Sequence, residues 1–469
     1  MLTAALAMGA LAGCGSSTAS SSATSASAAS DTAAASSAAT SSASSAAEDS
    51  SAASSASSTE EIASSSASDD AVTVTYWGWD VSNFAQPMME AYSKTHPNVK
   101  FECTSVEWGD MQTKVQQALA SGSELPTIVP MDISLIGGWK NMDIFENLTD
   151  YGLDTSKYIK ALTDAATTED GKVIGLFENA CPSGIAYKRD LAKEYFGTDD
   201  PEELQKMFSS YDDYVTHGKE VAEKSNGQVY LFHSGQAVAE WLYFASDIPN
   251  MDGDTINMTD KMTDVMGKLI DLRDAGCVDT YQSGTPEANA TYADDTHIFY
   301  PCPDWAITYY IKANDPDGTA AGNWGLIEAP SGYQHGGTAM GITSASSDEQ
   351  KKAAYDFITW CMSSEEGATT MKDTAGYITS DTTINTGDFA KRSDEDVFGG
   401  EDISTLLYKD IAERIEIPTP SQYDNDVINV RNDIAQQLMD DKSMTLDDAV
   451  SASIDELKTL VTDSSITIK

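Results

Sequence analysis

The pattern of apolar and polar positions changes at residue 71 and from there predicts an α/β fold. Residues 72–76 alternate between apolar side chains and threonine, which predicts a half-buried strand. Similar patterns predict an amphipathic helix that stops before Pro97, a strand over 99–103, a helix N-capped by Asp110 and a strand over 127–131. Strands that alternate with helices in this way are typical of a layer with a parallel sheet.

The pattern continues through the rest of the chain. Further strands are predicted over 173–177, 183–188, 229–232, 297–300 and 338–342. Further helices are predicted over 201–208 and 211–225, after Ser347, and after Thr445, which forms a capping pattern with Asp448. No internal repeat and no transmembrane segment is recognisable in the sequence. Together these elements predict an α/β protein.

Aromatic and acidic residues lie at or just past the ends of the first three predicted strands. In parallel sheets, ligands bind beyond the carboxyl ends of the strands. The residues in such positions are Trp77, Trp79, Asp80, Glu107, Trp108 and Asp132. We therefore expect a binding site at this edge of the first sheet.

The N-terminal residues have the pattern of a bacterial export signal. Residues 2–13 form a small apolar run, too short to span a bilayer, that ends in Leu11-Ala12-Gly13-Cys14. This motif resembles the lipobox of bacterial lipoproteins, in which the cysteine thiol accepts a diacylglycerol. No Lys or Arg precedes Lys94, so the usual basic segment is missing and we expect the true start to lie upstream. The expected signal peptide is 1–13 and the expected lipidation site is Cys14.

Residues 14–70 differ sharply from the rest of the chain, because they are almost entirely Ser, Ala and Thr. Such a segment has too little apolar surface to form a core, so we expect it to be disordered. A flexible coil of roughly 56 residues has a root-mean-square reach of about 40 Å. The segment is therefore expected to tether a folded body to a membrane.

Composition and charge exclude several functions. The net charge of −46 argues against nucleic-acid binding, which needs clustered Lys and Arg, and disfavours anionic ligands. The five His are scattered without metal-ligand spacing, and no cofactor motif is present. Apart from Cys14, the cysteines are odd in number and are expected to be mostly buried as small apolar residues. The sequence leaves open whether Cys181 and Cys302 form a disulfide.

Short stretches between residues 72 and 360 carry a family resemblance. They are 74–77, 92–99, 115–126 (with Thr127 in place of the usual Asp), 148–151, 171–175 with 186–191, 304–306 and 352–358. In this order they resemble motifs of the extracellular solute-binding proteins of ATP-binding-cassette (ABC) importers, in the large group that binds maltose and oligosaccharides. The resemblance is strong because the motifs keep the family order behind a lipobox.

The resemblance implies a two-lobed periplasmic-binding-protein-like α/β fold with a hinge, whose lobes are formed from discontinuous segments. Lobe 1 is expected to comprise 71–181 and 338–381, and lobe 2 to comprise 182–337 and 382–469. The implied function is capture of a carbohydrate, expected to be an oligosaccharide, by hinge closure and its delivery to an ABC permease. We expect no enzymatic activity and no cofactor or metal. The protein is expected to be a lipid-anchored monomer on the extracellular face of the cell membrane.

Sugars present apolar C–H faces and hydroxyl groups, so flat aromatic rings backed by carboxylates suit them. The aromatic candidates for the cleft are Trp77, Trp79, Trp108, Trp241, Trp305, Trp324 and Tyr423. The acidic candidates are Asp80, Glu107, Asp132, Glu178 and Asp304. Trp305 ranks first, because it follows a predicted turn, 301–304, that two prolines stiffen. For each candidate the alternative is a core aromatic or a solvated carboxylate.

Other functions stay open at this point. A surface glycoside hydrolase would need two carboxylates about 5 to 10 Å apart, and 74 acidic residues make such a pair easy to form by chance. No serine-hydrolase, zinc-protease or phosphate-loop motif occurs, however. A binding protein for a non-sugar solute is a second alternative, and an adhesion protein fits the predicted fold poorly.

Overall fold

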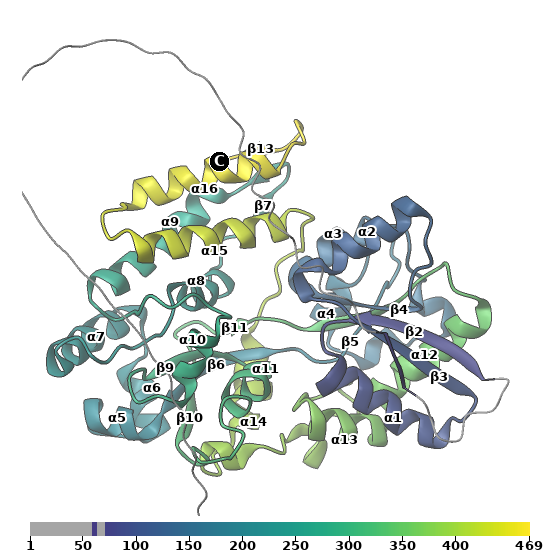
Figure 1. The fold of residues 1–469 in the computed structure, drawn as a ribbon, viewed down its shortest axis with the longest axis horizontal. Coiled ribbons are helices and arrows are strands. Elements are labelled where there is room, and N and C mark those ends of the chain that lie inside the picture. Colours follow the sequence, from purple (N-terminus) through teal and green to yellow (C-terminus); the bar gives the residue numbers. More distant parts are fainter. Residues whose placement is uncertain (1–58, 63–70) are drawn as a thin grey trace, which may run out of the picture. The chain divides into compact units, whose positions relative to one another are not determined.

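The computed structural model describes residues 59–62 and 71–469, and they contain two main sheets, each with its own helices (Figure 1). The first sheet has the strand order β1-β3-β2-β4-β12-β5. Its strands are β1 (Thr59–Ile62), β2 (Val72–Gly78), β3 (Val99–Ser105), β4 (Ile128–Asp132), β5 (Leu176–Phe177) and β12 (Thr338–Ile342). The predicted signal peptide 1–13 and Cys14 lie outside the described residues.

The strand directions in the first sheet bring several chain ends to one edge. β2 runs parallel to β3 and β4, as predicted, whereas β12 is antiparallel to both β4 and β5. Thr338, at the start of β12, pairs with Asp132 at the end of β4. The ends of β2, β4 and β5 and the start of β12 therefore meet at a single edge of the sheet.

Helices cover both faces of the first sheet, because its strands alternate between two cores. Val74 and Tyr76 of β2 pack in one core with α1 and α12, whereas Val129 and Met131 of β4 pack in the other core with α2 and α3. The helices of this lobe are α1 (Gln86–Thr95), α2 (Met111–Ser121), α3 (Ile136–Lys140), α4 (Lys160–Ala165), α12 (Asp348–Ser363) and α13 (Glu365–Thr374).

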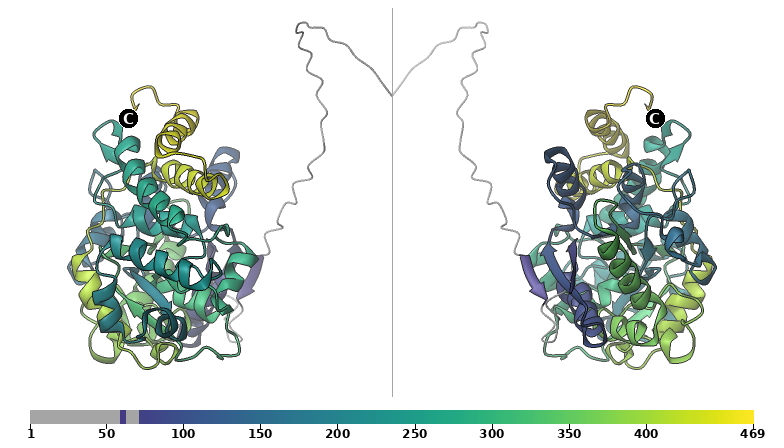
Figure 2. Two further views of the ribbon diagram at one scale, coloured as in Figure 1. Left: turned by 90° about the vertical axis from the view of Figure 1, so that its left-hand side faces the viewer. Right: turned by 90° about the vertical axis from the view of Figure 1, so that its right-hand side faces the viewer.

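The second sheet is built around β6, which pairs antiparallel with all its neighbours. Its strands are β6 (Pro182–Lys188), β9 (Phe299–Pro303), β10 (Trp324–Ile327) and β11 (Tyr333–Gln334). The helices around it are α5 (Arg189–Phe196), α6 (Pro201–Met207), α7 (Tyr211–Ser225), α8 (Gly235–Phe244), α9 (Met258–Asp274), α10 (Pro286–Ala290), α11 (Asp304–Ala306), α14 (Ile403–Thr405), α15 (Asp424–Asp440) and α16 (Leu446–Leu460). Helices α15 and α16 pack against α9 (Figure 1 and Figure 2).

Smaller elements complete the second lobe. A third sheet joins β7 (Met251–Asp252), β8 (Thr255–Ile256) and β13 (Thr467–Ile468). Two π-helical segments, Ile307–Lys312 and Leu406–Ile411, continue α11 and α14. Nowhere in the described part of the chain is there a helix both long and apolar enough to cross a membrane.

The chain crosses between the two sheets at short segments that lie beside one another. One crossing, 178–181, joins β5 to β6, and another, 335–337, joins β11 to β12. A third segment, around Ser380, lies beside the first crossing. There the Ser380 N–H donates to the Glu178 carbonyl at 3.1 Å. These crossings form the hinge region, and the bounds assigned above to the two lobes stay a prediction.

Several predicted elements are confirmed. The helix over 211–225 has the predicted bounds, and the hydroxyl of Thr445 accepts from the Asp448 N–H at 3.2 Å in a capping box. The five described cysteines are all free and buried. The disulfide between Cys181 and Cys302 that the sequence left open therefore does not form.

Other local predictions were wrong. Residues 301–303 belong to strand β9 rather than to a turn, and their prolines are tolerated because β9 pairs with β6 alone. Residues 229–232 make only single bridges, to His297 and to Val278, so no continuous strand forms. Asp110 precedes α2 without a side-chain capping bond. Within the predicted tether, Thr59–Ile62 pair antiparallel with β3, because backbone pairing at a free sheet edge needs no apolar side chain.

Candidate ligand-binding cavity

A cavity of about 500 Å³ lies where the edge of the first sheet faces the second lobe across the hinge region. Its walls combine aromatic rings, carboxyl groups and the backbone of the crossing segments. The lining residues are Trp79, Asp80, Trp108, Asp132, Glu178, Cys181, Glu240, Trp305, Tyr309, Tyr310, His335, Gly336, Gly337, Thr338 and Tyr377. Cavities of this size and composition are typical of small-molecule sites.

The wall on the first lobe follows from the strand directions described above. Trp79 and Asp80 come directly after β2, Trp108 follows β3, and Asp132 ends β4. Glu178 follows β5 and is only 5% exposed. Because these strand ends share one edge of the sheet, the three carboxyl groups and two indoles face one cavity.

The wall on the second lobe is a group of rings that begins at α11. The centroid of the Trp305 ring lies 5.5 Å from that of Tyr310 and 5.4 Å from that of His335, both edge-on. The indole N–H of Trp305 donates to the His335 carbonyl at 2.9 Å, which fixes the orientation of the ring. This bond ties the ring to the crossing segment.

Gly336 allows Trp305 to approach the crossing segment closely. Its φ of +97° lies in the left-handed region, which disfavours side chains. A Cβ atom there would lie 2.7 Å from the indole nitrogen of Trp305. Both constraints select glycine at this position.

Asp80 and Glu178 are two carboxyl groups whose charged form is disfavoured by burial and is stabilised only by neutral donors. These donors are Tyr309 and the backbone of Asn83 and Phe84 at Asp80, and Thr338 at Glu178. Asp80 accepts a hydrogen bond from the hydroxyl of Tyr309, and its Oδ1 atom is buried without a partner. Burial raises the pKa of Asp80 to about 6. Burial and, next to it, the charge of Asp80 raise the pKa of Glu178 well above its ordinary value.

The other carboxyl groups in the cavity have stronger partners. Asp132 accepts hydrogen bonds from the N–H and hydroxyl of Ser134, although burial still raises its pKa. Glu240 lies 3.1 Å from the His335 ring nitrogen and 3.6 Å from the guanidinium of Arg431. Glu240 is therefore held in an ion-pair network.

This arrangement suits a solute that combines apolar faces with many hydrogen-bond donors. The indoles and phenols offer flat surfaces, and the carboxylates accept hydrogen bonds. Lysine and arginine are absent from the residues that line the cavity in the described part of the chain. The site therefore favours neutral or cationic solutes over anionic ones.

The structure brings half of the sequence-predicted site residues to this cavity. They are Trp79, Asp80, Trp108, Asp132, Glu178 and Trp305. Their roles in binding stay predictions, since a position on the wall does not by itself establish a contact with solute.

Two predicted tryptophans lie in the core instead. Trp241 is 2% exposed on α8 and packs against Tyr214 and Phe232. Trp324 is also 2% exposed, on β10, where its ring lies 5.4 Å from that of Tyr300. These two rings fill the second lobe, which is the alternative that the sequence left open for each of them, and their contact with solute stays a prediction.

Asp304 is fully buried beside the cavity rather than on its wall. Its Oδ2 accepts from the Asn179 amide at 3.1 Å and from the Tyr408 hydroxyl at 2.7 Å, and burial raises its pKa. The backbone carbonyl of Asp304 accepts from Arg392 at 3.2 Å. Asp304 therefore links the hinge region to the start of α11.

The remaining predicted residues also lie off the cavity wall. Trp77 is half-buried against the first lobe, with the Lys114 ammonium 4.8 Å from its ring centroid. Glu107 is exposed. Tyr423 packs on the second-lobe core, and its hydroxyl donates to Asp463 at 3.3 Å. Trp77 and Tyr423 therefore pack on their own lobes, whereas Glu107 faces solvent.

Sequence reasoning missed several wall residues. Tyr309 and Tyr310 follow Trp305 by about one helical turn, a spacing that could have indicated a shared face. Glu240, His335 and Tyr377 carried no comparable signal, because each comes from a segment remote in sequence.

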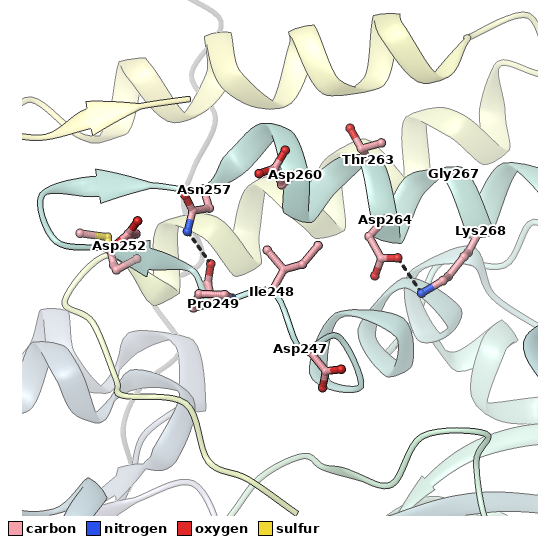
Figure 3. Close-up of a pocket in the computed structure, with 11 residues that line it drawn as sticks. Asp247, Ile248, Pro249, Asp252, Asn257, Asp260, Thr263, Asp264, Gly267 and Lys268 are labelled. Carbon is pink, nitrogen blue, oxygen red and sulfur yellow. Dashed lines mark hydrogen bonds and ion pairs between the residues drawn. The ribbon is translucent and has the colours of Figure 1, made fainter.

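A larger open groove, of about 970 Å³, lies on the second lobe along α9 (Figure 3). Its lining includes Asp247, Asp252, Asp260 and Asp264 but no aromatic ring. Asp264 is already ion-paired with Lys268 at 2.7 Å, as the dashed line in Figure 3 shows. With walls from one lobe only, this groove lacks the features of the cavity at the hinge.

Comparisons with known proteins agree with the fold. A lactose-binding protein of Rhizobium radiobacter is 26% identical over 289 residues, which cover 55% of this chain. The chain spans 66% of the length of that relative. The family model described as bacterial extracellular solute-binding protein matches residues 87–397.

Solved structures show the same two-lobed fold. An extracellular solute-binding protein of family 1 matches with a TM-score of 0.70 at 20% identity, covering 83% of this chain and 99% of the other. The galacto-N-biose/lacto-N-biose I-binding protein of Bifidobacterium longum matches with a TM-score of 0.67 at 18% identity, covering 86% and 100%. The fold is thus the two-lobed periplasmic-binding-protein-like α/β fold predicted from the sequence, and the relatives are binding proteins rather than enzymes. Because the family model matches well over half of its residues, the chain belongs to the bacterial extracellular solute-binding proteins.

Proposed function

We propose that this protein captures a carbohydrate in the cavity at the hinge and delivers it to the permease of an ABC importer. The observation that carries the proposal is the cavity wall, in which Trp79, Trp108 and Trp305 stand beside Asp80 and Glu178. Stacking of an indole on the C–H face of a sugar, with hydroxyl groups donating to carboxylates, is the chemistry these residues offer.

Closure of the two lobes accounts for capture. The cavity takes residues from both lobes, and the hydroxyl of Tyr309 on the second lobe donates to Asp80 on the first. A solute that contacts both walls binds better to the closed state than to the open one. It therefore shifts the population toward closure, by its difference in affinity for the two states.

The relatives support a sugar as the solute. The 26% identical relative is named a lactose-binding protein, and the Bifidobacterium longum structure holds lacto-N-biose. A glycoside hydrolase is disfavoured, since the family consists of solute-binding proteins. The length of the saccharide is left to experiment.

The N-terminal sequence supports a place at the outer face of the membrane. We propose that Cys14 carries the lipid and that the Ser/Ala-rich segment after it tethers the body near its permease. Leu11-Ala12-Gly13-Cys14 and the composition of residues 15–70 support this arrangement.

A thermal-shift screen of the purified protein against mono- and oligosaccharides tests the proposal. A ligand present at 100 times its Kd stabilises the folded state by about 2.7 kcal/mol, which raises the melting temperature measurably. We expect at least one saccharide to do so without being hydrolysed, as chromatography of the recovered sugar checks. Stabilisation only by amino acids, peptides or anions would refute the proposal.

A further inference from the structure

The ionisable side chains that line the cavity are mostly acidic. Four carboxyl groups line it, those of Asp80, Asp132, Glu178 and Glu240, whereas the described wall contains no lysine or arginine. His335 is the basic side chain on the wall, and its ring nitrogen lies 3.1 Å from Glu240. The field of the whole chain, with a net charge of −46, adds to this bias toward cations.

Among the four wall carboxyl groups, only Glu240 has a cation within ion-pair distance in the described chain, and Asp80 lies close enough to Glu178 for its charge to act on it. The carboxylate of Glu240 lies beside the His335 ring and the Arg431 guanidinium. Asp132 accepts hydrogen bonds from the N–H and the hydroxyl of Ser134. Within the described chain, by contrast, no Lys, Arg or His nitrogen lies within the 4.0 Å ion-pair distance of Asp80 or Glu178. Asp80 also has a buried oxygen, Oδ1, with no hydrogen-bond partner. These two groups therefore lack a cation.

Such a pair is costly to keep ionised in a closed cavity, because burial removes water from two like charges. A hydroxyl group of a neutral sugar offers one dipole to such a carboxylate. A protonated amine offers a full charge and three donors, so it compensates two neighbouring carboxylates better than a hydroxyl group does. The ring of Tyr309, whose hydroxyl donates to Asp80, adds a surface that also attracts a cation.

We infer that the solute is a saccharide that carries a primary amine, with its ammonium group bound between Asp80 and Glu178. The inference rests on the proposed function, because it names the class of sugar for the same cavity. It predicts that the remaining part of the sugar stacks on Trp305, while anionic sugars are rejected by the unpaired carboxylates.

Matched sugar sets test the inference on the full-length protein by titration calorimetry. Each set has an amine, the hydroxyl compound and the N-acetyl compound on one skeleton: glucosamine, glucose and N-acetylglucosamine, the galactose equivalents, and β-linked and α-linked disaccharides of both. We expect the amine of at least one set to bind about tenfold or more tightly than its hydroxyl and N-acetyl partners, as a charge-assisted bond implies.

The outcomes separate the two proposals. If, in every set that binds, the hydroxyl or the N-acetyl sugar binds within tenfold of its amine or more tightly, the inference is overturned and carbohydrate binding stays intact. No binding by any sugar of any set overturns the inference, and the thermal-shift screen against longer saccharides then decides separately whether the proposed function stands.

Two variants locate the ammonium. Asp80→Asn and Glu178→Gln keep the shape of each side chain but remove its charge, so each should reduce the preference for the amine to within about twofold. Asp252→Asn on the groove of Figure 3 removes one exposed charge away from the cavity and should leave the preference unchanged. An amine preference that survives in both cavity variants would contradict the assigned position.

Discussion

Replacement of Trp305 by alanine tests the stacking role of the ring at the centre of the second-lobe wall. The variant removes the flat surface that faces the cavity and also the N–H bond to the His335 carbonyl. Loss of a buried aromatic anchor costs about 2 kcal/mol or more of binding free energy, which corresponds to roughly thirtyfold weaker binding.

The effect of the same change on folding is expected to be smaller than for a core tryptophan. Trp305 is only half-buried, so its removal should cost less than the 3 to 5 kcal/mol typical of a fully buried ring. The lost hydrogen bond contributes about 1 kcal/mol, and the edge-on contacts with Tyr310 and His335 contribute about another 1 kcal/mol. We therefore expect a free energy of unfolding about 2 kcal/mol lower.

The assay combines titration calorimetry with denaturant unfolding of the sugar-free protein. Trp305→Phe serves as a partial variant, because it keeps a ring but loses the N–H, and it should bind more tightly than Trp305→Ala. Trp324→Phe is the matched control in the core, and it should lower stability with affinity within about twofold of the native value. Unaltered affinity in a destabilised Trp305→Ala protein would refute the stacking role.

Other predictions address the glycine, the titration and the anchor. Gly336→Ala should weaken binding by about tenfold or more, because a Cβ would meet the Trp305 indole at 2.7 Å, and calorimetry checks this; native affinity would contradict it. Because burial raises the pKa of Asp80 to about 6, protonated Asp80 stabilises the fold below pH 4, and this contribution is lost as the pH rises through 6. Asp80→Asn should therefore flatten the fall in unfolding free energy between pH 4 and 7, by at most about 3 kcal/mol, and an unchanged slope in denaturant unfolding would count against the burial argument. Cys14→Ala should release the protein from membranes on fractionation, and normal retention would argue against the lipid anchor.

The fold was largely predictable because its signals are local. The alternation in β2 and the capping pattern at Thr445 each depend on a few neighbouring residues, and the structure has both elements where they were expected. The edge strand β1 was not predictable, because pairing with β3 depends on backbone groups and not on the side-chain pattern.

The site was predictable only in part, because a wall residue is defined by what lies opposite it. Strand ends indicated Asp80 and Asp132, and both line the cavity, since parallel strands bring their ends to one edge. The burial of Trp324 was not predictable, because the direction of its ring depends on its register opposite Lys188 in the second sheet. The contact of Tyr309 with Asp80 joins segments more than 200 residues apart, and no local pattern encodes it.

A crystal structure of the protein with the tightest-binding sugar from the screen shows directly whether a saccharide occupies the cavity at the hinge. We expect density for the sugar between Trp305 on one lobe and Asp80 and Glu178 on the other, with the two lobes closed around it. Density for the same sugar in the groove along α9, with the cavity at the hinge filled only by water, would contradict it.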